Sequence, residues 1–251
     1  MSAYQVIDTH NTGPVDEARV ASALAILQEA AALGAAGARA IFSTSFGAED
    51  VVVLDLIARH ALAIDSFTLD TGRLPEATYN VMQATEQRYG SIVKVYFPDA
   101  SAVEALVTRN GINGFYDSVE NRKACCGVRK LEPLARALAG RPAWVTGLRS
   151  AQSVTRTDTP AREHDAERQL DKFNPLHDWS ERDVWAYIRA HDLPYNALHD
   201  QFYPSIGCAP CTRAISPGED IRAGRWWWED PALKECGLHA HEGKVMRIKA
   251  V

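Results

Sequence analysis

Apolar residues recur with helical spacing near the start of the chain. From about Asp16 to Leu33 an alanine-rich segment carries them on a single stripe, at Val20, Leu24, Leu27 and Ala31. A stripe with this period predicts an amphipathic helix, and the sequence GAAGAR that follows supplies glycines at which such a helix ends. The first element is therefore expected to be a helix that packs on a core.

After this helix, short apolar runs alternate with longer helical ones. RAIFST (39–44), AIDSFTLDTGR (63–73) and SIVKVYF (91–97) have the length and apolar content of buried strands. VVVLDLIARH (51–60) and PEATYNVMQATEQRYG (75–90) have the pattern of helices, and the second starts on a proline and closes on a glycine. The order strand, helix, strand, helix, strand predicts a parallel sheet that helices cover on both faces.

The pattern continues into the second half of the chain. A helix is expected from about Ser118 to Ala139, and a fourth strand at PAWVTGLR (142–149). The polar segment 150–169 is expected to be a mobile loop, and KFNPL (172–176) to be extended. WSERDVWAYIRAH (179–191) predicts a helix that a serine caps, and beyond it the sequence is rich in Pro, Gly and Trp and predicts loops.

Composition limits the classes of partner. A chain of 251 residues with 46% hydrophobic residues suits one α/β domain with appendages. A net charge of -5 and a pI near 5.9 give no overall attraction to phosphate backbones or anionic lipids, so we expect neither nucleic acid nor a membrane as partner. The start, MSAYQVIDTHNTGP, lacks the features of a secretory signal, so we expect a cytoplasmic protein.

The chain has five cysteines, and in a reducing compartment these are expected to be ligands or nucleophiles. Cys125 and Cys126 are neighbours in a predicted helix, and Cys208 and Cys211 form a CxxC in the loop IGCAPC. Four thiolates can hold a [4Fe-4S] cluster or a zinc ion, and we favour iron because adjacent cysteines would strain two bonds to one zinc. Alternatively, the CC pair is two small buried residues and the CxxC a redox pair.

Two turns that follow predicted strands are candidate ligand contacts. FSTSFGAED resembles a phosphate-binding turn without the GK[ST] ending of a Walker loop. Its backbone N–H groups and the hydroxyls of Ser43, Thr44 and Ser45 are suited to one phosphate or sulfate, although a hydroxyl-rich helix cap explains the segment equally well. LDTGR lies where open α/β sheets bind ligands, but it is also an ordinary turn sequence.

Basic residues near these turns are candidate anion contacts. Arg156, Arg222 and Arg225 lie in polar loops, and Lys130 follows the CC pair. The planar guanidinium can bind phosphate or sulfate through two hydrogen bonds, although scattered surface charges are the common alternative.

The fifth cysteine, Cys236, lies near the end of the chain. It is flanked by Lys234 and His239 in a polar, glycine-containing sequence. Nearby cations favour the thiolate and hence a nucleophile, whereas many single cysteines are inert. The run Trp226 to Trp228 before it is suited to hold the tail to the body of the protein.

Together these segments resemble the assimilatory sulfonucleotide reductases, and among them the bacterial adenylylsulfate reductases. The similar segments are the CC pair with its CxxC, STSFGAED, LDTGRL, TGLRSAQS, KFNPL, IGCAPCTR, GRWWW and KECGLH, which extend over most of the chain. The resemblance implies an adenine nucleotide hydrolase-like, Rossmann-like α/β fold with a mobile C-terminal tail. It divides the chain into an N-terminal helical segment (1–37), a nucleotide-binding domain that carries the cluster (38–215) and a tail that carries the catalytic cysteine (216–251).

The resemblance further implies an oxidoreductase that reduces adenosine 5′-phosphosulfate (APS) to sulfite and AMP in sulfate assimilation and cysteine biosynthesis, with electrons from thioredoxin. Cys236 is implied to attack the sulfate sulfur and to carry it as an S-sulfocysteine. The implied substrate contacts are Ser43, Ser45, Gly47, Leu69, Lys130, Gly147, Arg156, Arg222, Arg225 and His239. The implied ligands of a structural and electrostatic [4Fe-4S] cluster are Cys125, Cys126, Cys208 and Cys211, and a homo-oligomer is expected.

Three alternatives remain open at this point. Related enzymes that use the 3′-phosphorylated substrate (PAPS) typically lack the cluster cysteines, so APS is expected, with a PAPS or dual APS/PAPS reductase as the alternative. The family also resembles ATP pyrophosphatases, but their SGGxDS loop reads STSFGAED here, which disfavours a tRNA-thiolating enzyme. The third alternative is a non-catalytic iron–sulfur redox sensor.

Overall fold

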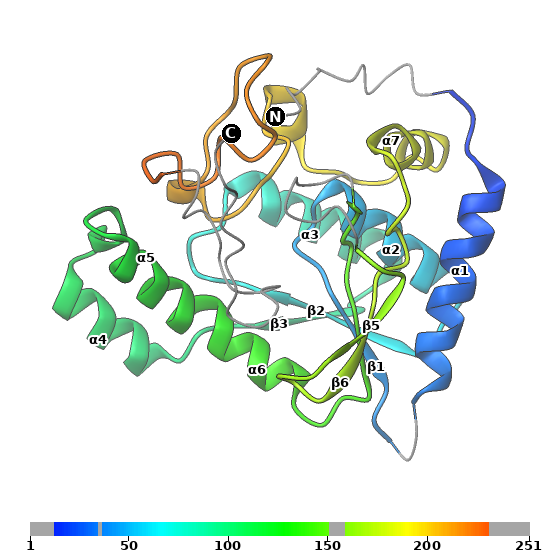
Figure 1. The fold of residues 1–251 in the computed structure, drawn as a ribbon, viewed down its shortest axis with the longest axis horizontal. Helices are drawn as coiled ribbons and strands as arrows, with labels where there is room; N and C mark the ends of the chain where they lie inside the picture. The colour runs from blue at the N-terminus through cyan, green and yellow to red at the C-terminus, as the bar shows by residue number, and fades with distance from the viewer. Residues whose placement is uncertain (1–12, 35–36, 151–158, 231–251) are drawn as a thin grey trace, which may run out of the picture.

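A six-stranded sheet forms the centre of the protein (Figure 1). The computed structural model describes residues 13–34, 37–150 and 159–230. The strands are β1 (Ala40–Ser43), β2 (Ile64–Leu69), β3 (Val93–Tyr96), β4 (Ala143–Val145), β5 (Arg162–Asp165) and β6 (Leu170–Phe173). Their order is β3-β2-β1-β4-β6-β5, and each neighbouring pair is parallel except β5 with β6. The predicted α/β class is confirmed, with an antiparallel strand at one edge.

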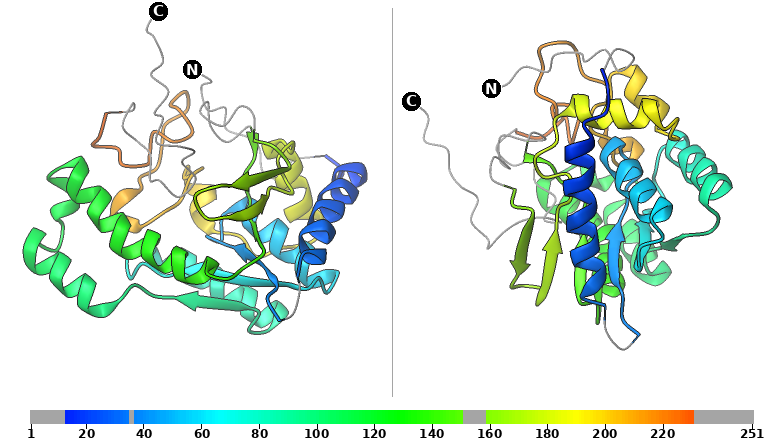
Figure 2. Two further views of the ribbon diagram at one scale, coloured as in Figure 1. Left: turned by 60° about the horizontal axis from the view of Figure 1, so that its bottom comes forward. Right: turned by 90° about the vertical axis from the view of Figure 1, so that its right-hand side faces the viewer.

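Helices cover both faces of this sheet (Figure 2). The α-helices are α1 (Glu17–Ala32), α2 (Ala48–Arg59), α3 (Glu76–Tyr89), α4 (Ala100–Asn110), α5 (Val119–Cys126), α6 (Glu132–Leu138) and α7 (Glu181–Ala190). Shorter helical turns are η1 (Gly114–Tyr116), η2 (Gly127–Leu131), η4 (Ala197–Gln201) and η5 (Ala209–Cys211). None of the helices in the described ranges has the length and apolar content to cross a membrane.

Alternate residues of the strands face two separate cores, because successive side chains of a strand point to opposite faces. On β1, Phe42 packs in a core with residues of α1, α2 and α7, whereas Ile41 packs in a second core with Leu134 and Leu138 of α6. Trp144 of β4 belongs to the second core. Burial of one such large apolar side chain contributes about 1.5–3 kcal/mol, so both faces contribute to holding the carboxyl ends of the strands in place.

A buried carboxylate joins three helices on the first face. Asp55 of α2 is almost completely buried and accepts hydrogen bonds from Tyr89 of α3 (2.7 Å) and Tyr187 of α7 (2.7 Å). Arg59 lies 3.2 Å from the same carboxylate. These three partners compensate for the desolvation of the carboxylate. In turn, burial and the contact with Asp55 raise the pKa of both tyrosines. The network fixes α3 and α7 against α2.

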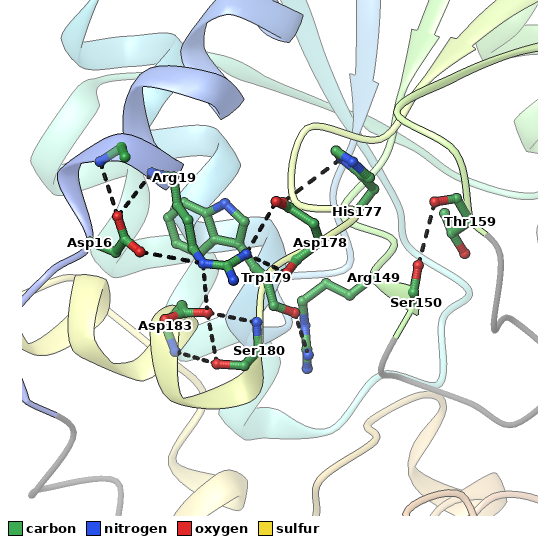
Figure 3. Close-up of polar contacts among 11 residues, drawn as sticks. Asp16, Arg19, Arg149, Ser150, Thr159, His177, Asp178, Trp179, Ser180 and Asp183 are labelled. Atoms are coloured by element: carbon green, nitrogen blue, oxygen red, sulfur yellow. Dashed lines mark hydrogen bonds and ion pairs between the residues drawn. The ribbon is translucent and has the colours of Figure 1, made fainter.

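The start of α7 is tied to the first helix (Figure 3). The predicted cap of α7 is confirmed: the Asp183 carboxylate accepts the backbone N–H of Ser180 at 2.8 Å, and the Ser180 hydroxyl accepts that of Asp183 at 3.2 Å. Arg19 of α1 lies 3.4 Å from the Asp183 carboxylate and 3.2 Å from that of Asp178. This arginine therefore links α1, which Asp16 caps, to the segment that leads from β6 to α7.

One prediction about the second half of the chain was wrong in part. The polar segment 150–169 was expected to be a loop, but residues 162–165 form edge strand β5. Its strand character was hidden because cross-strand ion pairs hold it: Lys172 of β6 is buried and lies 2.8 Å from Glu163. Arg162 pairs in the same way with Asp171, at 2.7 Å. Residues 151–158 of that segment lie outside the described ranges.

The helical segment expected from about Ser118 to Ala139 is confirmed, but it is not regular throughout. It consists of α5, a π-helical turn at Gly127–Leu131 and α6. Pro133 has no N–H to donate at the start of α6, and a wider turn before it accommodates the missing hydrogen bond. Helix α4, which the periodicity did not indicate, begins after Asp99, whose side chain accepts the N–H of Ala102.

Candidate functional site

The strand order predicts a ligand site at the carboxyl ends of β1 and β4. The chain builds β2 and β3 on one side of β1 and then returns to place β4 on its other side. In open α/β sheets ligands bind at such a reversal of strand order. Leu69 ends β2, Ser43 ends β1, and Gly147 follows β4 at this edge. The predicted contacts of an adenine nucleotide therefore come from three adjacent strands.

Gly147 allows the loop after β4 to approach the start of α2. A Cβ atom at this position would lie 2.3 Å from Oδ1 of Asp50 and 3.3 Å from Cβ of Glu49. Arg149, two residues on, is buried and donates two hydrogen bonds to Oε1 of Glu49, at 2.6 and 2.8 Å. It also donates to the carbonyl of Trp179 before α7 (Figure 3). The glycine is thus required by close packing between the two loops.

The predicted phosphate-binding turn already holds a carboxylate of the chain itself. Asp50 accepts hydrogen bonds from the backbone N–H of Ser45 (2.6 Å) and from its hydroxyl (2.8 Å). Burial raises the pKa of Asp50 to about 6, although the hydrogen bonds from Ser45 and Gly47 lower it. The hydroxyl of Ser43 accepts from Nε1 of Trp144 at 2.8 Å. A phosphate at this turn would meet these donors only in competition with Asp50.

The four candidate ligand cysteines line one cavity. Cys125 and Cys126 end α5, and Cys208 and Cys211 bracket η5. All four are free thiols, and they share the cavity with Arg73, Phe115, Arg122, Arg129, Lys130, Pro210 and Trp226. The structure therefore brings together two cysteine pairs that the sequence separates widely. Within the described ranges, no group of three or more His, Cys, Asp or Glu side chains is arranged to hold a metal ion.

Positive charge and burial act in opposite directions on these thiols. Burial raises the pKa of Cys208, but the charge of Lys130 and a hydrogen bond with Thr71 (3.2 Å) outweigh it and lower the net value. Burial and the neighbouring Cys208 raise the pKa of Cys211 to about 12. Burial also raises the pKa of Cys125, against the charge of Arg129. Of Cys125, Cys208 and Cys211, Cys208 is therefore the thiol that ionises most readily.

The LDTGR turn forms one wall of this cavity. Thr71 contacts the sulfur of Cys208, and its carbonyl accepts a hydrogen bond from Nη1 of Arg129 at 2.6 Å. The carbonyl of Arg73 accepts the N–H of Ala209, in the CxxC, at 2.8 Å. Sequence reasoning did not identify Thr71, Arg73 or Arg129 as site residues. The position of LDTGR after a strand was the available signal, but taken alone the segment was better explained as an ordinary turn.

Two of the predicted basic contacts lie beside the cysteine cavity and one lines a second cavity. Lys130 lines the cysteine cavity. Arg225 packs against Gly207, where a Cβ would lie 2.3 Å from Nη2, and its charge lowers the pKa of Cys208. Arg222 lines a second cavity together with Glu49, Arg149 and Ser205. Predicted site residues Arg156, Cys236 and His239 lie outside the described ranges.

The three consecutive tryptophans differ in environment. Trp226 is 1% exposed, whereas Trp227 is 49% exposed. Trp228 packs edge-on against Tyr116 of η1, with ring centroids 4.4 Å apart. The carboxylate of Glu229, the next residue, is buried against Arg122 of α5. Residues 226–229 therefore fasten the chain to the cysteine-bearing helix just before the described part of the chain ends.

Comparison with protein families gives a match over most of the chain. The phosphoadenosine phosphosulfate reductase domain family matches residues 39–214. A protein named adenosine 5′-phosphosulfate reductase from Allochromatium vinosum is 61% identical over 202 residues, which are 80% of this chain and 79% of the relative. Proteins with the same name from Sinorhizobium fredii (81% of both chains) and Neisseria meningitidis (79% of this chain, 82% of the relative) are 53% and 54% identical.

Solved structures with the same architecture have lower identity. A phosphoadenylyl-sulfate reductase from Candida auris, in a phosphate complex, aligns with a TM-score of 0.64 and 24% identity over 85% of this chain and all of that chain. Yeast FAD synthetase aligns with a TM-score of 0.54 and 14% identity over 85% of this chain and 70% of that one. Both likenesses support the fold alone.

Replacing Asp50 with Asn tests the charge in the turn. Because its pKa is about 6 in the folded chain against 3.8 as the ordinary value, the folded state holds the proton more tightly. The contribution of Asp50 to stability is therefore greatest below the ordinary value and is lost as the pH rises through 6. The free energy of unfolding of Asp50→Asn, relative to wild type, should increase by about 1–2 kcal/mol between about pH 4 and pH 7 in urea titrations. A difference independent of pH would contradict this assignment.

Proposed function

The chain belongs to the family of the adenosine 5′-phosphosulfate reductases, and from this we propose that it reduces APS to sulfite and AMP in sulfate assimilation and cysteine biosynthesis. The observation that carries the proposal is the 61% identity to a relative of that name, over about four-fifths of both chains. Two features support it: the strand order reverses at β1 and β4, which is where open α/β sheets bind ligands, and the turn after β2 contributes Arg73 to a cysteine-lined cavity.

The proposed reaction uses Cys236 as the nucleophile. Its thiolate attacks the sulfate sulfur of APS, the bond from that sulfur to the bridging oxygen breaks, and AMP leaves with the electron pair. A thiolate of thioredoxin then attacks the Cys236 sulfur and displaces sulfite. This step leaves a mixed disulfide between thioredoxin and Cys236. The second thioredoxin thiol resolves that disulfide and restores Cys236. Two electrons from one dithiol thus reduce the sulfur from sulfate to sulfite, and two protons are released.

The chain's own cations are proposed to neutralise the substrate. The nucleotide carries negative charge on both its phosphate and its sulfate, and an attacking thiolate must approach against that charge. Lys130 and Arg225 beside the cysteine cavity, and Arg222 in a second cavity, are proposed for this role. Arg156 and His239 are proposed for the same role from the family resemblance.

We also propose that Cys125, Cys126, Cys208 and Cys211 hold a [4Fe-4S] cluster. The donor set fits this group, because the four thiols line the walls of a single cavity that cations surround. A polynuclear cluster binds one thiolate at each iron, so its ligands need to enclose a volume, unlike ligands of one ion, which must converge on a point. When bound, the cluster would supply structural support and electrostatic stabilisation beside the substrate.

The proposed division of labour follows the three segments of the chain. Residues 1–37 add a helix to the outside of the sheet, 38–215 hold nucleotide and cluster, and 216–251 carry the nucleophile. A dithiol donor and reduced cysteines require a reducing compartment, so we propose the cytoplasm as the location. A homo-oligomer stays a prediction.

Iron content tests the cluster. Cys211→Ser should lower bound iron and visible absorption to about background, because removal of one of four ligands opens the cluster to loss. Cys236→Ser is the matched control and should retain both, since it is not among the four. Iron analysis and absorption spectra of protein purified without oxygen measure this. A wild-type protein that is colourless and iron-free yet fully active would refute the cofactor.

Cys236→Ser tests the nucleophile itself. A serine hydroxyl is a far weaker nucleophile than a thiolate at neutral pH, so sulfite release should fall by at least about 10³-fold. Equilibrium binding of APS and the visible colour should persist. Unchanged sulfite release would exclude the proposed mechanism. If no sulfite were released by either protein and Cys236→Ser kept the biological function, the redox-sensor alternative would be favoured. Pyrophosphate release from ATP would favour the tRNA-thiolating alternative.

A comparison of APS and PAPS tests the substrate. With purified protein and thioredoxin, kcat/KM for sulfite release should be at least about 10-fold higher with APS, because a site without a partner for the 3′-phosphate pays for desolvating that charge. Equal values would identify a dual-specificity reductase. A preference for PAPS would reverse the assignment.

A further inference from the structure

A buried ion pair joins the cysteine-bearing helix to the base of the C-terminal segment. Arg122 of α5 donates from Nε to Oε1 of Glu229 at 2.9 Å and from Nη2 to Oε2 at 2.7 Å. The two side chains are 1% and 3% exposed. The two parallel hydrogen bonds define both the distance and the orientation of the groups. Burial of both charges is costly, so such a pair is weak evidence of added stability and better evidence of a fixed geometry.

The pair belongs to a compact junction at the cysteine cavity. The guanidinium of Arg122 also lies 4.7 Å from the centre of the Trp226 ring. The N–H of Trp226 donates to the carbonyl of Cys211 at 3.1 Å, and the N–H of Glu229 donates to the carbonyl of Trp226 at 2.8 Å. Residues 226–229 are thus held at once by the helix that ends in Cys125 and Cys126 and by the CxxC loop.

We propose that Arg122 and Glu229 are positioning residues for Cys236: the pair fixes the position of Glu229, from which the chain continues to Cys236. This inference rests on the proposed function of Cys236. That cysteine follows Glu229 by seven positions, a reach of at most about 25 Å for an extended chain. The local concentration of a tethered group depends on the length of the tether and on where it starts. A loosened anchor lengthens the tether and misdirects it, so attack on the sulfate slows while the nucleotide contacts stay in place.

The chain provides a matched control for this pair. Arg213 and Glu219 form a similar two-point contact, at 2.8 and 3.0 Å, in the same C-terminal part of the structure. Their side chains are 40% and 33% exposed, and this contact lies within one loop. Exposed ion pairs contribute little to stability. Glu219→Gln therefore removes the same chemistry without detaching residues 226–229 from α5.

The test compares Glu229→Gln with Glu219→Gln in the iron-loaded protein. The first readout is hydrogen–deuterium exchange of the peptide that spans residues 224–229, the second is the single-turnover rate of sulfo-group transfer from APS to Cys236 without thioredoxin, and the third is KM for APS. In Glu229→Gln, protection of the peptide should be lost and the transfer rate should fall about 10-fold, with KM for APS within about 2-fold of wild type. Glu219→Gln should match wild type in all three measurements.

Arg122→Lys is the second variant, because it keeps the charge but loses the two-point contact. It should give an intermediate transfer rate, and it decides the question alone if Glu229→Gln loses iron or does not fold. An unchanged transfer rate in the decisive variant overturns the inference, whether or not exchange increases. A lower rate without increased exchange also overturns it, because Glu229 then acts other than through the anchor. Full activity of Cys236→Ser would instead refute the proposed function.

Discussion

The pairing of β1 with β2 on one side and with β4 on the other determines where the site can form. Because these strands are parallel and adjacent, the turns that follow them emerge at one edge of the sheet. The turn after β2 then reaches the CxxC loop, through Thr71 and the carbonyl of Arg73. The turn after β4 reaches the start of α2, where only glycine fits at position 147. Both cores under the sheet contribute to maintaining this arrangement.

Burial of charge is the second constraint on the structure. Different buried charged groups are compensated by different kinds of partner. Asp55 and Glu229 are paired with donors from distant helices, so their charge is compensated at a fixed geometry. Asp50 is compensated less completely, and its pKa rises to about 6. The cysteine cavity collects Arg73, Arg122, Arg129 and Lys130 around thiols that would carry negative charge as thiolate ligands. A cavity of this kind suits an anionic guest.

Much of the fold followed from periodicity, because the elements that make it are strongly patterned. The alternation from β1 to β3 and the capped helix α7 lie where their apolar spacing placed them. Strand β5 was missed because its cross-strand partners are ions rather than apolar residues, so that its sequence reads as a loop. The cysteine sets and Lys130 were accessible through motif spacing. The pair of Arg122 and Glu229 could not be predicted from the sequence, because a contact between single residues far apart in the chain leaves no local pattern.

The π-helical turn between α5 and α6 has a consequence for how the chain length can vary there. The two cysteines that end α5 face the cavity, while Leu134 and Leu138 of α6 face the sheet. The wide turn at Gly127–Leu131 sets the rotational phase between these two faces. A π-helical turn accommodates about one residue more than an α-helical turn, so deleting one residue here would restore regular pitch and leave the two faces in nearly the same phase. The segment is thus the place where a change of one residue in chain length can be absorbed without turning the cysteines away from the cavity.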